Sequence, residues 1–377
     1  MIRTGWPEEG EKITSFAARA FAQDGVEADL RGLLPKVYAA PGAAAAQHLI
    51  LEEDGAWQGV LLRVRTTLAV GDRRLAVGHI GTVCTAPEHR GKGVMQRLMA
   101  RALDDLAAQG CDLAALSGQR QRYERYGFVP TGTKTEFIFC AANVKGRALP
   151  GDALRPLADP RLLAAARTLF DTQAVHMERG AEAFEQILAS WGARAFAFLR
   201  QGEFAGYCTV FEQEGRLAVS ELRLRHPALL GALCELLIRQ TGGELKLCLA
   251  PGAPEAPAAA ALCERYRLGP DHSFRILCFP SVADALLRRR HAACPLPEGT
   301  LRLWVEGHGG LELYVAGGEA GVRPCAAAAA RETLTYAQAV HLLFSPCCAG
   351  RGPLARTNPA AAAWLPLPLS LEQNDCY

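Results

Sequence analysis

The chain has 377 residues and a mass of 40.5 kDa, which corresponds to two or three domains at roughly 150 residues each. Hydrophobic residues make up 50% and charged residues 21%, as in globular proteins, so extended disorder is excluded. The formal net charge of +2 argues against a dedicated nucleic-acid-binding protein. No apolar run approaches the roughly 20 residues of a membrane span, and the first residues lack the apolar core of a signal peptide.

The 13 cysteines are scattered, and none form a C-x-x-C pair. This spacing favours reduced thiols in a cytoplasm over a disulfide framework or a zinc site. We therefore expect a cytoplasmic protein without a structural metal.

In the first segment, residues 1–148, the spacing of apolar residues changes from that of a strand to that of a helix and back. Its predicted elements are a helix at 13–21, strands at 47–53, 57–68 and 74–85, a helix at 94–109, a strand at 112–117, a short helix through Tyr123 and Tyr126 and a closing strand at 137–141. Turn dipeptides such as Asp54-Gly55 separate the first three strands and are typical of antiparallel hairpins. Gly110 stands where a helix C-terminal cap is expected.

The second segment, residues 149–280, repeats this order of elements. Its predicted elements are helices at 162–170 and 181–190, strands at 195–200, 204–212 and 217–224, a helix at 229–239 and a strand at 244–249. The repeat predicts two copies of one α/β unit, from element order rather than from residue identity.

The third segment, residues 281–377, predicts a helix at 282–290, a hairpin over 301–316 and a helix at 334–343. The tail after Trp364 contains prolines but also four leucines, at positions 365, 367, 369 and 371. A frayed terminus rarely carries so many leucines, so the tail is expected to be packed.

Candidate chemistry concentrates at residues 83–99, where a strand ends, a glycine-rich turn follows and a helix begins. Such a turn offers free backbone N–H groups and a helix N-terminus, which together favour a pyrophosphate. Gly91 and Gly93 leave the backbone unobstructed, and Arg90 and Lys92 add positive charge. The spacing is neither G-x-x-x-x-G-K-[ST] nor G-x-G-x-x-G, so the common nucleotide loops are excluded.

This stretch resembles the acetyl-CoA loop of the GNAT (GCN5-related) N-acetyltransferases, Arg/Gln-x-x-Gly-x-Gly/Ala. Arg90, Gly93 and Met95 fill the pattern, although Met95 departs from the small last residue. Downstream, residues 122–130 resemble the family's Tyr-x-x-x-Gly-Phe element.

The organisation of the whole chain resembles the Eis (enhanced intracellular survival) type of this family, whose loop often has a bulky residue at the position of Met95. The resemblance implies an α/β fold with mixed sheets: tandem GNAT units, the second one degenerate, followed by a C-terminal unit like sterol carrier proteins. It also implies a homo-oligomer, commonly a hexamer. The second unit has no Arg-x-x-Gly-x-Gly pattern at 224–231, so one cofactor per chain is expected.

The resemblance implies acetyl-CoA as co-substrate, no metal, and a set of site residues. The backbone amides of Val83, Cys84 and Thr85 would hold the cofactor. The pyrophosphate would lie on Arg90, Gly91, Lys92, Gly93, Val94, Met95 and Gln96.

For catalysis, Tyr123 matches the family's general acid, and Tyr126 is its nearby rival. The base would be the C-terminal carboxylate of Tyr377, with His79 or a water molecule as alternatives. Cys84 is a weaker candidate for an acyl-carrying nucleophile, because the sequence shows no base for it.

The expected function is transfer of an acetyl group to a primary amine on an aminoglycoside-, polyamine- or lysine-like acceptor. The alternatives are transfer of a longer acyl chain, or non-enzymatic binding of CoA or a lipid. The sequence does not distinguish among the acceptors.

Overall fold

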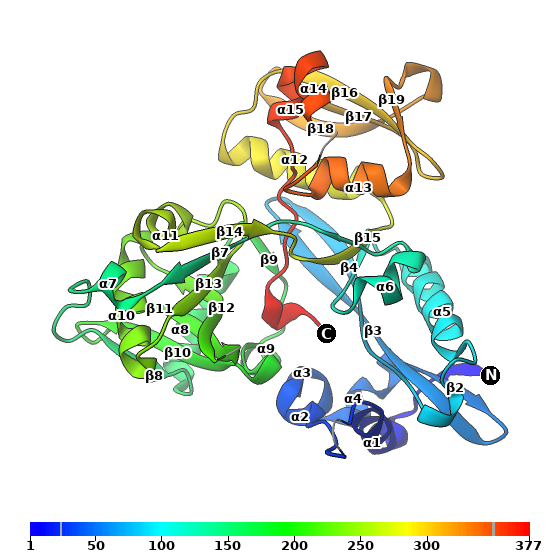
Figure 1. The fold of residues 1–377 in the computed structure, drawn as a ribbon, viewed down its shortest axis with the longest axis horizontal. Coiled ribbons are helices and arrows are strands. Elements are labelled where there is room, and N and C mark those ends of the chain that lie inside the picture. The colour runs from blue at the N-terminus through cyan, green and yellow to red at the C-terminus, as the bar shows by residue number, and fades with distance from the viewer. Residues whose placement is uncertain (23–24, 214, 349–350) are drawn as a thin grey trace.

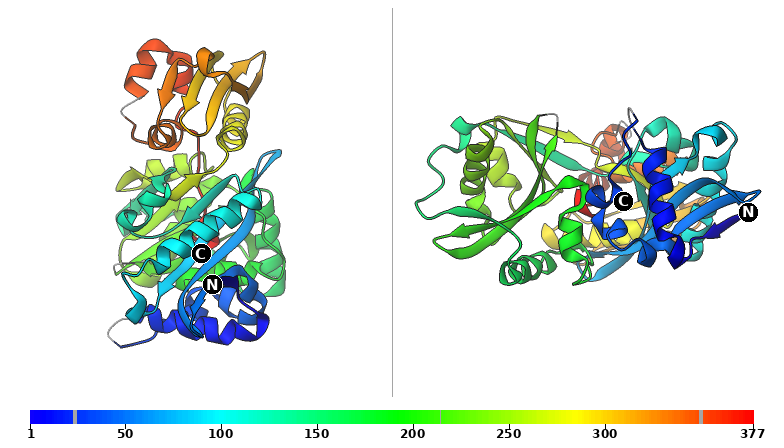
Figure 2. Two further views of the ribbon diagram at one scale, coloured as in Figure 1. Left: turned by 90° about the vertical axis from the view of Figure 1, so that its right-hand side faces the viewer. Right: turned by 90° about the horizontal axis from the view of Figure 1, so that it is seen from below.

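The computed structural model describes residues 1–22, 25–213, 215–348 and 351–377. These residues form three sheets of eight, seven and four strands. The four-stranded sheet lies above the two larger ones in Figure 1, and the larger two stand side by side. Seen from below, the C-terminus lies between them (Figure 2). No helix in the described part of the chain is long and apolar enough to cross a membrane.

The first sheet contains one parallel pair, β4–β5, and its other pairs are antiparallel. Along the main path its strands are β1 (Ile2–Thr4), β2 (His48–Glu53), β3 (Ala56–Val70), β4 (Arg73–Thr85), β5 (Leu113–Leu116), β15 (His272–Ile276) and β6 (Val129–Thr131), with β9 (Val175–Met177) paired to β3.

Helices cover both faces of this sheet. One face packs on α5 (Val94–Ala108), whose Leu98, Ala102 and Leu106 are fully buried. The other face packs on the N-terminal helices, which are α1 (Gly10–Ala20), α2 (Leu30–Leu33), α3 (Pro35–Tyr38) and α4 (Pro41–Ala44). The predicted helix at 94–109 is confirmed, with Gly110 in the left-handed conformation after its end (φ 70°).

The second sheet repeats this arrangement. Its strands, in spatial order, are β14 (Arg265–Gly269), β7 (Lys134–Phe139), β13 (Leu245–Leu249), β12 (Arg216–Leu224), β11 (Glu203–Gln213), β10 (Arg194–Arg200) and β8 (Ala153–Pro156). The helices beside it are α7 (Ala141–Val144), α8 (Pro160–Asp171), α9 (Phe184–Leu188), α10 (Leu230–Thr241) and α11 (Ala256–Leu262). Its one parallel pair, β12–β13, corresponds to β4–β5.

The two larger sheets exchange strands. The strand expected to close the first sheet is β7, and it pairs with β13 and β14 in the second sheet. Its Phe137 and Phe139 are buried in the second core. Conversely β15, from the second segment, lies between β5 and β6 of the first sheet. Periodicity identifies a strand but not its partner, so the division at residues 148 and 280 follows the order of elements and not the composition of the sheets.

The third sheet is ordered β18 (Glu319–Cys325), β17 (Gly309–Ala316), β16 (Gly299–Val305) and β19 (Glu332–Leu334). The helices of this part are α12 (Phe279–Ala293), α13 (Tyr336–Phe344), α14 (Arg351–Thr357) and α15 (Pro359–Ala363). The predicted helices at 282–290 and 334–343 and the hairpin between them are confirmed.

Short helices complete the chain: α6 (Arg120–Tyr123) and the 3-10 turns η1 (Pro7–Glu9), η2 (Ala45–Gln47), η3 (Pro87–His89), η4 (Glu124–Tyr126), η5 (Ser190–Gly192), η6 (Pro227–Leu229), η7 (Ala327–Ala329) and η8 (Gln373–Asp375).

The C-terminal tail runs from the third sheet down to the gap between the two larger sheets, in red in Figure 1. The four tail leucines are buried, which confirms that the tail is packed. Two connections between the larger sheets hold it. In the β6–β7 connection Thr133 N–H donates to the Leu369 carbonyl (2.9 Å), and in the β14–β15 connection Asp271 accepts from Leu371 N–H (2.7 Å). The tail therefore brings residue 377 back to the first sheet.

Candidate active site

Strand β4 bulges and then leaves its neighbour β5. Between Val60 and Leu62 of β3, β4 advances by three residues, from Cys84 to Gly81, so it contains one extra residue. Thr82 lies at this bulge and has φ 47°. The parallel pairing of β4 with β5 ends at His79 and Ala115, while β4 continues to Thr85. The end of β4 therefore has a backbone edge without a strand partner from β5.

The turn after β4 leads directly into α5. Gly91 (φ 77°) and Gly93 (φ 76°) are in the left-handed conformation, and Gly93 is the N-cap of the helix. No side chain caps this helix start, so the amides of its first turn are available to an anion. A Cβ atom at either glycine would meet nothing within 4 Å. The glycines are thus required for backbone conformation rather than for space inside the protein.

A cavity of about 720 Å³ lies over the end of β4 and the start of α5. It is lined by nine of the ten residues that the sequence predicted for the cofactor, namely Val83, Cys84, Thr85, Arg90, Gly91, Gly93, Val94, Met95 and Gln96. Lys92 is the tenth and does not line it. The remaining lining residues, which the sequence analysis had not assigned, are Ala20, Phe21, Ala22, His89, Arg122 and Arg125.

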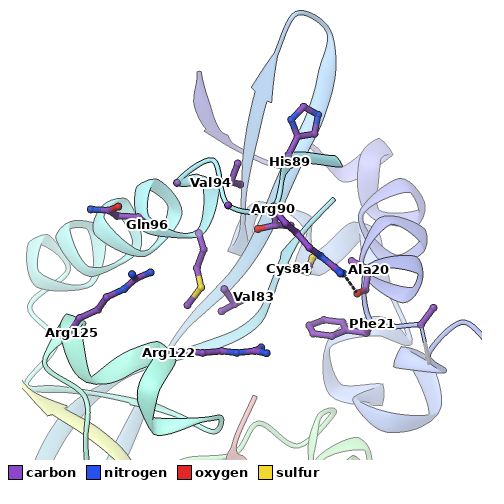
Figure 3. Close-up of a pocket in the computed structure, with 15 residues that line it drawn as sticks. Ala20, Phe21, Val83, Cys84, His89, Arg90, Val94, Gln96, Arg122 and Arg125 are labelled. Carbon is purple, nitrogen blue, oxygen red and sulfur yellow. Dashed lines mark hydrogen bonds between the residues drawn. The ribbon is translucent and has the colours of Figure 1, made fainter. Parts of the chain in front are cut away.

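The cavity is electropositive. Arg90, Arg122 and Arg125 contribute guanidinium groups, and none of the described lining residues is acidic. Figure 3 shows Arg90 donating a long hydrogen bond to the Ala20 carbonyl (3.5 Å), with the Phe21 ring and the Arg122 side chain below it in this view. Such a cavity suits a ligand with several phosphate groups.

Tyr123 is buried in the first core and does not line the cavity, although its neighbour Arg122 does. Its ring packs over Gly118, where a Cβ atom would lie 2.6 Å from ring atom Cε2. Burial raises the pKa of Tyr123, so the phenol keeps its proton at neutral pH. Tyr126 is half-buried, and its hydroxyl accepts a hydrogen bond from Arg125 (2.9 Å).

The C-terminal carboxyl group of Tyr377 lies against Gly81. A Cβ atom at Gly81 would stand 2.6 Å from the carboxyl carbon and 2.8 Å from a carboxyl oxygen, so only glycine fits there. The Tyr377 ring packs on the His79 ring, with centroids 4.9 Å apart. The terminus therefore lies near the point where β4 separates from β5. The residue it contacts, Gly81, precedes the cavity-lining Val83 by two positions.

His79, a candidate base, and Cys84, a candidate nucleophile, are both buried, and burial shifts the pKa of each away from the value its role needs. Burial, with a smaller effect of the charges of Lys36 and His272, lowers the pKa of His79 to about 3, so its imidazole stays neutral. Its Nε2 lies 2.8 Å from the Thr66 hydroxyl. Burial raises the pKa of Cys84 to about 12, which keeps it an unreactive thiol at neutral pH.

The sequence analysis also missed a thiol–imidazole–carboxylate chain beside the terminus. Cys376 Sγ lies 3.0 Å from His272 Nε2, and His272 Nδ1 lies 2.9 Å from Asp271. The three residues come from the tail and from the start of β15, which no motif in the sequence connects. Neither this chain nor any other group of three or more His, Cys, Asp or Glu side chains in the described residues is placed to hold a metal ion.

Comparison with known proteins agrees with this geometry. Residues 1–131 match the family model described as acetyltransferase (GNAT) domain. No curated protein matches the chain. The segment 1–131 is therefore a GNAT acetyltransferase domain, and the protein is an enzyme of the acyltransferase class.

Solved structures share the fold over the entire chain. A probable N-acyltransferase from Enterococcus faecalis, a conserved protein of unknown function, aligns with a TM-score of 0.69 and 15% identity, covering 100% of this chain and 99% of its own. A GCN5-related N-acetyltransferase from Kribbella flavida aligns with a TM-score of 0.67 and 17% identity, covering 100% and 98%. Eis1 from Mycobacterium abscessus aligns with a TM-score of 0.65 and 16% identity, covering 100% of both chains.

The helix start at Gly93 provides a test of the cofactor site. Valine at Gly93 should weaken acetyl-CoA binding more than about tenfold, because a left-handed L-residue costs about 1–2 kcal/mol or else redirects the first-turn amides. Gly110→Val is the matched control, since Gly110 has φ 70° at the far end of the same helix and lies outside the cavity. Isothermal titration calorimetry measures both. Unchanged affinity in folded Gly93→Val protein would contradict the assignment.

Proposed function

We propose that this enzyme is an N-acetyltransferase that moves the acetyl group of acetyl-CoA to a primary amine. The acceptor class is an aminoglycoside-, polyamine- or lysine-like amine. The observation that carries the proposal is the position of the Tyr377 carboxyl group on Gly81, next to the strand end that lines the electropositive cavity. An anionic proton acceptor and a phosphate-binding helix start thus meet at one strand.

In the proposed complex, the pyrophosphate of acetyl-CoA lies on the first-turn amides of α5, with Gly91, Gly93 and Arg90 around it. The open edge of β4 at Val83, Cys84 and Thr85 would pair with the amide groups of the pantetheine arm. Arg122 and Arg125 supply further charge for the remaining phosphate. The thioester then points toward the gap between β4 and β5.

The proposed reaction is direct attack. The amine loses a proton to the Tyr377 carboxylate, directly or through one water, and its nitrogen bonds to the thioester carbonyl carbon. The tetrahedral intermediate then expels CoA as a thiolate, and the Tyr123 hydroxyl donates a proton to the sulfur. An α-carboxylate is ionised at neutral pH, and a phenol is protonated, so both groups start in the required state. The alternative to Tyr377 is a base that acts through a water molecule; His79, the other candidate, is disfavoured by its lowered pKa.

The Eis-type architecture is part of the proposal. Strand β12 has the same extra residue as β4, since it advances from Glu221 to Val219 while β11 advances only from Thr209 to Val210. The repeated bulge and the repeated parallel neighbour support a second, degenerate GNAT unit. The Eis1 alignment over the whole chain supports a shared fold. The sterol-carrier-like third unit and a homo-oligomer such as a hexamer are proposed from the family resemblance.

The role of Tyr123 can be tested against its neighbour. Replacing Tyr123 with Phe should lower turnover about 10²–10⁴-fold, which is the usual contribution of a general acid, with little change in acetyl-CoA affinity. Tyr126→Phe is the matched control and should have a mild effect. Rates are measured as the release of free CoA with a panel of polyamines and aminoglycosides. If Tyr126→Phe is the damaging change, the acid is misassigned.

The base can be tested without altering any side chain. One glycine added after Tyr377 moves the carboxylate by up to about 3.6 Å, and a misplacement of about 1 Å already costs roughly 100-fold. The extended enzyme should bind acetyl-CoA normally but acetylate at least about 100-fold more slowly. The control is an extension of Met1 by one glycine, because Met1 does not line the cavity and its ammonium donates to the Glu52 carbonyl. Full activity of the C-terminally extended protein would exclude the carboxylate.

A further inference from the structure

The last four residues of the chain are held by the first unit through Lys36. The Lys36 ammonium, on α3, donates to the backbone carbonyls of Asn374 (2.7 Å) and Cys376 (2.6 Å). It also lies 3.9 Å from the centroid of the Tyr377 ring. From the same helix, Tyr38 makes a 2.7 Å hydrogen bond with Thr82 at the bulge of β4. Helix α3 thus contacts both the tail and the strand on which the terminal carboxyl lies.

The second unit holds the same residues from the other side. The Trp191 indole N–H donates to the Cys376 carbonyl (3.1 Å), which Lys36 also contacts. Buried Arg179 donates to both carboxylate oxygens of Asp375, each at 2.8 Å, and to Glu221 at 2.6 Å. The Asn374 amide donates to the Leu188 carbonyl (2.9 Å). Each of residues 374–376 is therefore fixed by at least one side chain or carbonyl outside the tail.

We propose that Lys36 is a positioning residue that, together with Trp191 and Arg179, fixes the Tyr377 carboxylate on Gly81 in the geometry for proton transfer. This inference rests on the proposed role of the Tyr377 carboxylate. We call Lys36, Trp191 and Arg179 the clamp. Two of its three residues come from the second unit, so this unit, which lacks the glycine-rich loop, would contribute to catalysis by positioning the base.

Two physical arguments support the clamp. Chain termini fray unless they are tied down, and a reacting group misplaced by about 1 Å can lose about 100-fold in rate. In addition, burial lowers the pKa of Lys36 to about 8, which means that its charge is kept in a place where charge is unfavourable. Enclosed lysines with such shifts concentrate at functional sites.

Two ionisable groups near Lys36, His79 and the Tyr377 phenol, do not change charge in the same pH range. Burial and neighbouring cations lower the pKa of His79 to about 3, and burial raises that of the Tyr377 phenol well above its usual value. Asp375 is paired with Arg179. Burial alone would lower the pKa of His272, but Cys376 and Asp271 raise it well above the ordinary value.

The test is the kinetics of Lys36→Met. We expect kcat to fall about 10–100-fold while KM for acetyl-CoA changes less than about twofold, because the cofactor cavity does not include Lys36. Lys12→Met is the matched control: the Lys12 ammonium also lies 3.9 Å from an aromatic centroid, that of Trp57, but not near the tail. Unchanged kcat in folded Lys36→Met protein would overturn the proposal.

A double-mutant cycle separates this inference from the proposed function. In the enzyme extended by one glycine, Lys36→Met should cause no further loss, because the base is already displaced. An equal loss in both backgrounds would mean that Lys36 acts elsewhere and would overturn the inference. Full activity of the extended enzyme alone would instead refute the role of the carboxylate itself.

The pH profile gives a readout that a purely structural lysine would not affect. Lys36 is protonated below a pH of about 8, so the advantage of wild type over Lys36→Met in kcat should be full below that pH and should shrink above it. A ratio that stays constant through pH 7–9.5 would contradict the charged clamp. If Lys36→Met does not fold, Trp191→Phe removes the second donor to the Cys376 carbonyl and should lower kcat in the same way; no effect there would overturn the clamp.

Discussion

The close contact between the Tyr377 carboxyl group and Gly81 is the constraint on which the site depends. It requires a residue without Cβ on β4 near the point where β4 leaves β5, because the Tyr377 carboxyl group occupies that space. A substitution at Gly81 would force either the strand or the terminus to move, since the nearest carboxyl atom lies 2.6 Å from the Cβ position. The fold therefore holds the Tyr377 carboxyl group in direct contact with β4.

Two other features of the fold hold the tail at this contact. Exchange of β7 and β15 ties the two larger sheets together, and the proposed clamp residues contact the tail from both of the units that are joined in this way. Arg179, Glu221 and Asp375 form a buried charged network at the tail, and Tyr207 donates to Glu221. Removing one member of such a buried pair typically costs about 3–5 kcal/mol, so the network makes the tail an integral part of the fold.

Much of this arrangement can be predicted from the sequence, because the relevant signals are local. Three such signals are the helical spacing of apolar residues at 94–109, the glycines at 91 and 93 and the leucines of the tail. Each predicts the structure of its own segment, and the structure agrees in all three segments. What the sequence could not provide were partners distant along the chain. Strand β7 is an ordinary apolar strand whichever sheet it joins, and nothing near Lys36 in the sequence indicates a contact 340 residues away with Cys376. The same applies to Arg122 in α6 and Arg125 in η4, which follow β5 in the chain and line the same cavity as the glycine-rich turn.

The most direct test of the proposed mechanism is the structure of the enzyme bound to acetyl-CoA or CoA. The pyrophosphate should lie on the first-turn amides of α5, and the sulfur should lie in the gap between β4 and β5. The sulfur should be near enough to the Tyr377 carboxylate for an amine nitrogen to lie between them, with the tail still on Gly81. A cofactor bound outside the cavity of residues 83–96, or a tail displaced from Gly81 when the cofactor binds, would contradict the proposed mechanism.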